Sequence, residues 1–193
     1  QVVERAVAGD RVSAKVAVKK EKRDEREKAL AGKIIALPDA AYGVAIEDFE
    51  WDHDPYNRET GTQRHPSNHY ETAVDAHTPE EIVARCEARF RCLARDCIIF
   101  KWTTIPHLAI AVRTLELQGF TYKTHLVWHK LRSGRARGTG YWFTGEHEIV
   151  LVGVRGNVVP PATAHFRSLF EAPATEHSAK PDNIHEIIEF HWP

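Results

Sequence analysis

Residues 42–51, which read YGVAIEDFEW, decide the fold prediction for this chain. The apolar run at 42–46 has the character of a strand, and it stops at Glu47 and Asp48, where an aromatic residue, a third acid and an indole follow. In an open α/β sheet, ligands bind just beyond the carboxyl ends of the strands. Acids in this position also cap helices and begin turns. Taken alone, the stretch therefore favours a structural role over a ligand site.

Composition narrows the functional classes. The chain has 193 residues, which is enough for one domain with a sizeable core. Its 26 basic and 27 acidic residues give a net charge of −1, so any contact with nucleic acid must be local. Three cysteines without a CxxC pair indicate reduced thiols in a cytoplasmic protein. The sequence has neither an apolar run near the ~18 residues of a membrane span nor a metal-binding motif, so we expect no membrane and no metal.

The chain divides into two parts. Residues 1–32 include an almost entirely charged run, KKEKRDEREK at positions 19–28. Such a run is typical of a solvated helix or a linker, and the interleaved acids argue against a DNA-contacting arm. We therefore predict a charged helical segment or linker over 1–32 and one domain over 33–193.

The predicted domain alternates strands and helices. After the strand at 42–46, the polar stretch 52–78 is typical of a lid or binding segment. A helix from Thr78-Pro79 comes next, with the apolar stripe Ile82, Cys86, Phe90 and Leu93. A strand at 97–102 follows, and then a helix that ends at Gly119 and has the stripe Leu108, Ala111, Val112 and Leu115. The last elements are strands at 122–128, 148–154 and 168–170 and a helix from Lys180-Pro181 whose inner face carries Ile184, Ile187 and Ile188. This pattern predicts an α/β fold with a mostly parallel sheet and helices on both faces.

Six blocks of sequence occur in a specific order and spacing: 42–51, 68–70 (NHY), 100–102 (FKW), 119–130 (GFTYKTHLVWHK), 138–157 (GTGYWFTGEHEIVLVGVRGN) and 177–182 (HSAKPD). Together they resemble the MT-A70 family of AdoMet-dependent adenine-N6 methyltransferases, of the bacterial and phage type, from residue 33 to the end. The resemblance implies a Rossmann-like methyltransferase sandwich. It also implies methyl transfer from S-adenosyl-L-methionine to N6 of adenine in nucleic acid, with DNA favoured over RNA.

The family signature is Asp-Pro-Pro-Trp at the end of the first strand. By resemblance Asp48 and Trp51 take the places of its acid and indole, and Phe49 and Glu50 replace its prolines. The adenine amine is a poor nucleophile because its lone pair is delocalised into the ring. An acceptor at the amine hydrogens, with the nitrogen held in line with the methyl group, promotes the transfer. We therefore take Asp48, Phe49, Glu50 and Trp51 as the catalytic segment.

The resemblance also implies the remaining site residues. Lys180 matches a family lysine that lies between the cofactor and the target base. For each predicted residue a purely structural role, as an exposed, loop or packing residue, is the alternative. The predicted cofactor residues are Asp48, Lys180, Ser178, His177 and Ile35. The predicted substrate residues are Tyr70, His69, Trp51, Glu148 and Lys180, with Arg135 and Arg137 as phosphate contacts. Trp102 and Trp128 are expected to pack in the core or to line the floor of the pocket.

Lys101 is unusual because it stands in an otherwise apolar strand. A buried lysine needs a partner. We predict an ion pair between Lys101 and either Glu47 or Glu50.

Two further interpretations stay open. In the family a cofactor-binding strand, roughly Glu-Leu-Phe-x-Arg, follows the last helix, and the sequence stops before such a segment. The expected alternative is therefore a catalytically inactive MT-A70-like paralogue that binds nucleic acid or acts as a dimerisation partner, either as a homodimer or with another subunit. A third interpretation is an unrelated nucleotide-binding α/β domain. Binding of S-adenosylmethionine distinguishes the first interpretation from the second.

Overall fold

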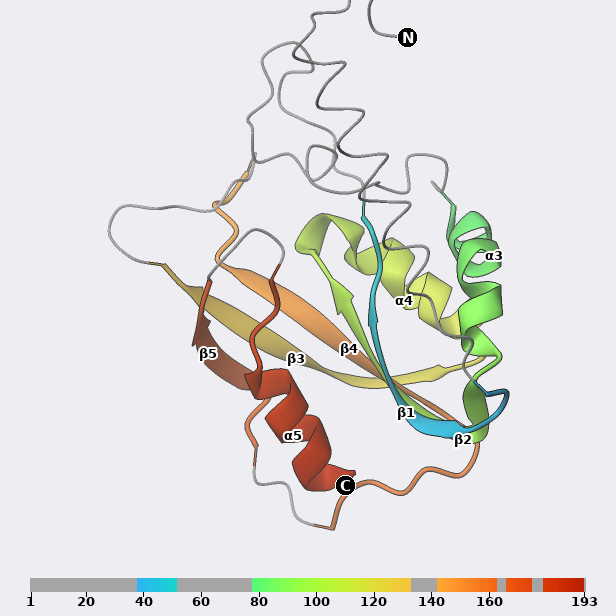
Figure 1. The fold of residues 1–193 in the computed structure, drawn as a ribbon. Coiled ribbons are helices and arrows are strands. Elements are labelled where there is room, and N and C mark those ends of the chain that lie inside the picture. Colours follow the sequence, from blue (N-terminus) through green and yellow to red (C-terminus); the bar gives the residue numbers. More distant parts are fainter. Residues whose placement is uncertain (1–37, 52–77, 133–141, 163–165, 175–178, 193) are drawn as a thin grey trace, which may run out of the picture. The chain divides into compact units, whose positions relative to one another are not determined.

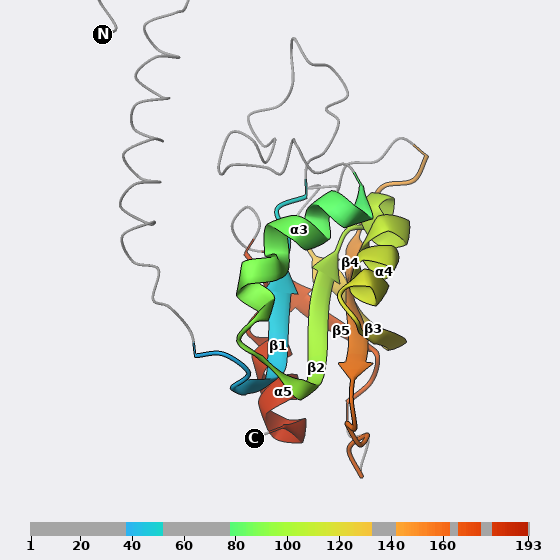
Figure 2. The ribbon, with the colours of Figure 1, turned by 90° about the vertical axis from the view of Figure 1, so that its right-hand side faces the viewer.

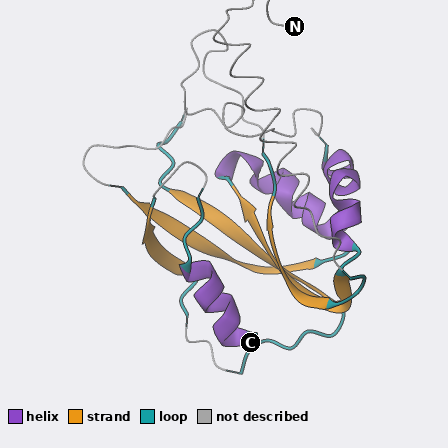
Figure 3. Cartoon of the chain, in the orientation of Figure 1, coloured by secondary structure: helices purple, strands orange, loops and turns teal. Residues whose placement is uncertain are grey.

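The computed structural model describes residues 38–51, 78–132, 142–162, 166–174 and 179–192 (Figure 1). All of these residues belong to one compact unit, Pro38–Pro193. The predicted charged segment 1–32 lies outside the described residues, and its boundary stays a prediction. The elements are β1 (Tyr42–Asp48), α3 (Pro79–Phe90), β2 (Leu93–Thr103), the 3-10 helix η2 (Ile105–His107), α4 (Leu108–Leu117), β3 (Thr121–Leu131), β4 (His147–Arg155), β5 (Leu169–Pro173) and α5 (Asn183–His191) (Figure 3).

The five strands form one mixed sheet in the order β1-β2-β4-β3-β5. β1 is parallel to β2 and β3 is parallel to β5, whereas β4 is antiparallel to both of its neighbours, β2 and β3. The predicted mostly parallel sheet is confirmed only in part: β1, β2, β3 and β5 run in the same direction, but β4 runs opposite to them and makes the sheet mixed. After β3 the chain turns back and β4 pairs with it directly. As a result β4 occupies the place between β2 and β3, and the connection through α4 passes over that position.

Helices cover both faces of the sheet, as predicted (Figures 1 and 2). α3 and α4 pack on one face around Ile82, Leu115 and the sheet residues Ile99 and Leu151. α5 packs on the other face, where Ile184 and Ile188 join a cluster that includes Phe100, Trp102 and Trp128. This two-sided arrangement is consistent with a methyltransferase-like sandwich. Within the described residues, the helices are all too short or too polar to span a bilayer.

The start of α3 follows the predicted capping signal. The Thr78 hydroxyl accepts a hydrogen bond from the Glu81 amide at 3.3 Å, and the Glu81 carboxylate accepts one from the Thr78 amide at 2.9 Å. This reciprocal pair satisfies two amides that have no partner within the helix, and Pro79 fits the first helical position. The predicted stripe holds for Ile82 and Cys86, which are buried. Leu93 instead begins β2, because the helix ends at Phe90.

The end of α4 agrees with the prediction, whereas α5 begins later than predicted. Gly119 has a φ of 84°, the left-handed conformation expected for a glycine just after a helix. The inner face of α5 is buried as predicted, but the helix begins at Asn183 rather than at Lys180-Pro181. Lys180 consequently lies in the irregular segment before α5, at the edge of the face that this helix covers.

Candidate functional site

The two adjacent acids at the end of β1 lie on opposite faces of the sheet, because successive strand side chains alternate. Glu47 is aligned with Lys101 of β2, on the face covered by α3 and α4. The fully buried Lys101 donates from Nζ to Glu47 Oε2 at 2.7 Å and to Gln118 Oε1 at 3.4 Å. The predicted ion pair of Lys101 is therefore confirmed, with Glu47 as the acid.

Asp48 lies on the α5 face, aligned with Trp102 of β2. Its Oδ2 is 3.0 Å from Nζ of Lys180, which comes from the segment before α5. The same Nζ lies 5.5 Å from the centre of the Trp102 ring. The fold thus brings together the acid and the lysine that the resemblance singles out, above a buried indole.

Glu148 of β4 lies beside this ion pair, at the same end of the sheet. It opposes Trp128 in the pairing of β3 with β4, and Lys130 projects from the same face of β3. Glu148 Oε1 contacts Lys130 Nζ, and Glu148 Oε2 is 3.7 Å from Lys180 Nζ. Lys130 Nζ also lies 4.8 Å from the centre of the Trp128 ring. We call Asp48, Lys180, Glu148 and Lys130 the charged row; their charges alternate in sign.

Two buried indoles, Trp102 and Trp128, lie beneath the two lysines of the charged row. The rings of Trp102 and Trp128 meet edge to face at 5.9 Å, and both are almost inaccessible to solvent. The Trp128 indole N–H donates to the Ala172 carbonyl oxygen of β5 at 3.0 Å, which fixes its orientation. The predicted packing role of both tryptophans is confirmed, and their aromatic faces give the row a flat apolar support.

Partial burial changes the proton affinity of Asp48. Desolvation raises the pKa of its carboxyl above the ordinary aspartate value, although Lys180 acts in the opposite direction. The nearby acids Glu148 and Glu50 also raise this pKa. Because 43% of the Asp48 side chain is exposed, water limits the size of the effect. Asp48 therefore holds a proton more readily than a free aspartate does.

Packing holds the turn after β1. Phe49 and Trp51 are buried, with their rings edge to face at 4.9 Å. The Trp51 indole stacks on His107 at 5.0 Å and donates from Nε1 to the Trp102 carbonyl oxygen at 3.3 Å. Glu50 pairs with Arg89 of α3 at 3.3 Å, apart from the charged row. These contacts fix the turn in the absence of prolines, while the predicted catalytic and substrate roles of these residues stay predictions.

The remaining predicted site residues lie outside the described residues, and their roles stay predictions: Ile35, His69, Tyr70, Arg135, Arg137, His177 and Ser178. Conversely, sequence reasoning did not select Lys130. The available signal was a lysine two residues after a buried tryptophan on the same strand. That signal acquires meaning only with the β3–β4 register, which places Lys130 diagonally across from Glu148.

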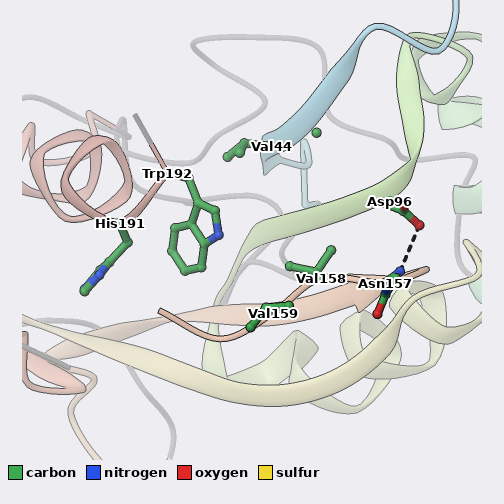
Figure 4. Close-up of a pocket in the computed structure, with 8 residues that line it drawn as sticks. Val44, Asp96, Asn157, Val158, Val159, His191 and Trp192 are labelled. Atoms are coloured by element: carbon green, nitrogen blue, oxygen red, sulfur yellow. Dashed lines mark hydrogen bonds between the residues drawn. The ribbon is translucent and has the colours of Figure 1, made fainter. Parts of the chain in front are cut away.

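A separate hollow of about 590 Å³ lies at the other end of β1 (Figure 4). Val44, Val158 and Trp192 line its apolar part, and Asp96 accepts a hydrogen bond from the Asn157 amide at 2.8 Å on its rim. Asp48 ends β1 and Val44 lies near its beginning, so the hollow and the charged row are at opposite ends of the strand. No three histidine, cysteine or acidic side chains gather as a metal site in the described part of the chain.

Comparison with known proteins gives a family match. The model of the MT-A70 family matches residues 89–191. The matched range contains Trp102, Lys130, Glu148 and Lys180 of the site, and it does not include β1 with Asp48.

Individual relatives cover similar parts of the chain. A type II methyltransferase, M.MunI, from Mycoplasma sp is 37% identical over 90 residues, which are 46% of this chain and 37% of that protein. An N(6)-adenosine-methyltransferase MT-A70-like protein from Arabidopsis thaliana is 30% identical over 105 residues, 50% of this chain and 15% of that protein. One from Drosophila melanogaster is 32% identical over 104 residues, 50% of this chain and 17% of that protein. The chain thus aligns with less than half the length of each of these relatives.

Proposed function

The chain belongs to the MT-A70 family, and we propose that it transfers a methyl group from S-adenosylmethionine to N6 of adenine in nucleic acid, with DNA rather than RNA as the substrate. The observation that carries the proposal is the 3.0 Å contact between Asp48 and Lys180 above the Trp102 ring. The contact lies where β1 and β2 end, the position at which open α/β sheets bind ligands. It supports the proposal independently of the family match, because that match does not include β1.

In the proposed mechanism Asp48 accepts a hydrogen bond from the N6 amine of the target adenine. This bond favours a localised nitrogen lone pair, which the free base lacks because the ring withdraws it. Lys180 orients Asp48 through their ion pair, and the buried Trp102 ring lies beneath the Lys180 ammonium and stabilises it. The raised pKa of Asp48 also suits the carboxylate to take up the proton that the amine loses after methylation.

S-adenosylmethionine supplies, when bound, a methyl group on a positively charged sulfur. The Asp48 carboxylate fits such a cofactor in charge, because it places a half-exposed negative group at the end of β1. We assign Lys180 to the boundary between cofactor and base. We assign Ile35, His177 and Ser178 to the cofactor side by resemblance to the family.

The proposed substrate contacts follow the same assignment. An adenine in a duplex has to be flipped out of the stack to reach the carboxylate. We assign His69, Tyr70 and Glu148 to the flipped base, and Arg135 and Arg137 to backbone phosphates. DNA is preferred because the resemblance is to bacterial and phage members of the family.

The test measures the transfer of a labelled methyl group from S-adenosylmethionine to two single-stranded oligonucleotides, one of DNA and one of RNA, each with one adenine. The control oligonucleotide carries purine, which lacks the N6 amine, at that position. We expect Asp48→Ala to lower the rate at least about 100-fold, because the acceptor at the reacting amine is lost. Asp39→Ala, at an exposed residue before β1, is the matched control and keeps the rate.

The outcomes separate the alternatives. Transfer to the DNA and not to the purine control supports the proposal, and transfer to RNA alone replaces DNA as the substrate. A folded chain that neither binds S-adenosylmethionine nor transfers a methyl group to either oligonucleotide leaves the inactive partner as the function. Because the pKa of Asp48 is raised, the rate should fall with decreasing pH earlier than for an ordinary aspartate.

A further inference from the structure

We propose that Lys130 is a positioning residue, which holds Glu148 so that Lys180 stays bound to Asp48. An effect of Lys130 on catalysis rests on the function proposed above, whereas its effect on the ionisation of Asp48 concerns the protein without cofactor or substrate. Lys130 is two steps removed from Asp48 along the charged row, so it acts through the other members. The effect of Lys130 on Asp48 depends on which carboxylate Lys180 prefers.

Within the described residues, two carboxylates lie near the Lys180 ammonium and compete for it. Its Nζ lies 3.0 Å from Asp48 Oδ2 and 3.7 Å from Glu148 Oε2. The Glu148 side chain is 14% exposed and that of Asp48 is 43% exposed. A carboxylate with less access to water has the greater need for a cation. Burial alone therefore favours Glu148 as the partner of Lys180, and the observed geometry is the reverse.

Lys130 resolves this competition. Its Nζ contacts the other oxygen of Glu148, and its side chain is 17% exposed. The backbone amide of Lys130 donates to the Glu146 carbonyl oxygen at 2.8 Å, and its ammonium lies over the Trp128 ring. Lys130 is thus fixed by the β3–β4 pairing, whereas Lys180 precedes α5 outside any helix or strand. A fixed cation supplies the charge that Glu148 requires.

Removal of the Lys130 charge should shift Lys180 toward Glu148. Among the described residues, the charged groups that act on the Asp48 carboxyl are Lys180 from the segment before α5, Glu148 from β4 and Glu50 from the turn after β1. Lys180 is the one among these three that stabilises the ionised carboxylate. As Lys180 turns to Glu148, Asp48 loses this attraction and retains its proton to a higher pH.

The test is the titration of Asp48 in the full chain without cofactor or substrate. Carbon-13 carboxyl resonances of labelled aspartates are followed with pH, and the Asp48 signal is assigned by its absence in Asp48→Asn. In Lys130→Met, which removes the charge and keeps most of the length of the side chain, we expect the midpoint to rise, with about a tenfold larger protonated fraction on the alkaline side of the transition. Lys130→Arg keeps the charge and should restore the wild-type midpoint.

Two controls give the experiment its specificity. Lys123→Met removes an exposed lysine from the same strand and should leave the midpoint unchanged. In the Glu148→Gln background, Lys130→Met should have no further effect, because the competing carboxylate is absent. Thermal unfolding verifies that each variant folds, and Lys130→Gln takes the place of Lys130→Met if the latter does not.

An unchanged midpoint in Lys130→Met overturns the proposal. A rise that persists in the Glu148→Gln background also overturns it, because Lys130 would then act on Asp48 directly rather than through Glu148. The titration needs no turnover, so a chain that fails to methylate adenine still tests the positioning role. If the chain is active, Lys130→Met should lower kcat most at acidic pH, with a smaller loss at alkaline pH.

Discussion

At the scale of single residues, Lys101 and Glu47 form an ion pair inside the sheet's α3/α4 face. Lys101→Met keeps the apolar bulk but leaves Glu47, which is 12% exposed, without its cation. We expect the free energy of unfolding to fall by up to about 3 kcal/mol, measured by urea denaturation. The exposed Lys123→Met is the control and should stay within about 0.5 kcal/mol of wild type. An equal stability of both variants would show that the pair is dispensable.

The three cysteines should differ in reactivity. Desolvation and the neighbouring Glu47 raise the pKa of the Cys86 thiol to about 12, and burial also raises the pKa of Cys97. Thiolates are the reactive species, so at pH 8 neither group should react with iodoacetamide in the folded chain. Cys92 is partly exposed and should be alkylated first. Mass spectrometry in native buffer and in urea tests this; labelling of Cys86 before Cys92 would contradict it.

Residue-level prediction from sequence succeeded where a chemical need was visible and failed where the partner depended on pairing. A lysine in an apolar strand needs an acid, which pointed to Glu47 or Glu50 for Lys101. Only the register of β1 against β2 selects Glu47. In the same way, the juxtaposition of Asp48 and Lys180 was expected from resemblance, whereas the contact between Lys130 and Glu148 follows from strand pairing that sequence spacing does not encode.

At the scale of elements, the turn after β1 is held by the two buried aromatics Phe49 and Trp51 rather than by prolines. Phe49→Ala should lower the free energy of unfolding by about 3–5 kcal/mol, because it leaves a cavity in the core. Phe49→Leu should cost less than about 1.5 kcal/mol, since it keeps most of the volume. Phe143→Ala, at an 89% exposed position, is the matched control and should be nearly neutral.

Circular dichroism during urea denaturation measures these differences. If Phe49→Ala and Phe143→Ala were equally stable, the turn would not depend on aromatic packing. If Phe49→Ala lost activity under conditions where it stays folded, the aromatics would also position Asp48, which adjoins Phe49 at the end of β1.

The boundaries of elements were predictable where the sequence carries a local chemical signal for them. The start of α3 carries a local signal in Thr78, Pro79 and Glu81, and each makes the expected capping contribution. Its end carries none, so the apolar Leu93 extended the predicted stripe into what is β2. The start of α5 at Asn183 shows the same difficulty, because Lys180-Pro181 resembles a helix start without a side-chain cap.

At the scale of the whole molecule, the alternation of strands and helices predicted a sandwich with helices on both faces but not the order of the strands. A helix between β2 and β3 implied adjacent parallel strands. Instead β4 pairs antiparallel to both and separates them. The placement of β4 depends on long-range pairing, and the continuous apolar character of a doubly covered strand is the same in either direction.

The net charge of −1 means that the molecule as a whole does not attract nucleic acid, so the proposed binding would have to depend on a few local cations. If Arg135 and Arg137 each contact one phosphate of a single strand, the slope of log K against log salt should become less steep by about 1.4 in the Arg135→Ala/Arg137→Ala variant. Fluorescence anisotropy of a labelled oligonucleotide over a salt series measures this slope. The control Arg85→Ala/Arg113→Ala removes two exposed arginines from α3 and α4 and should leave the slope unchanged. Equal slopes in the two double variants would show that other cations contact the phosphates. Both double variants lose two positive charges, so a difference between their slopes could not come from net charge.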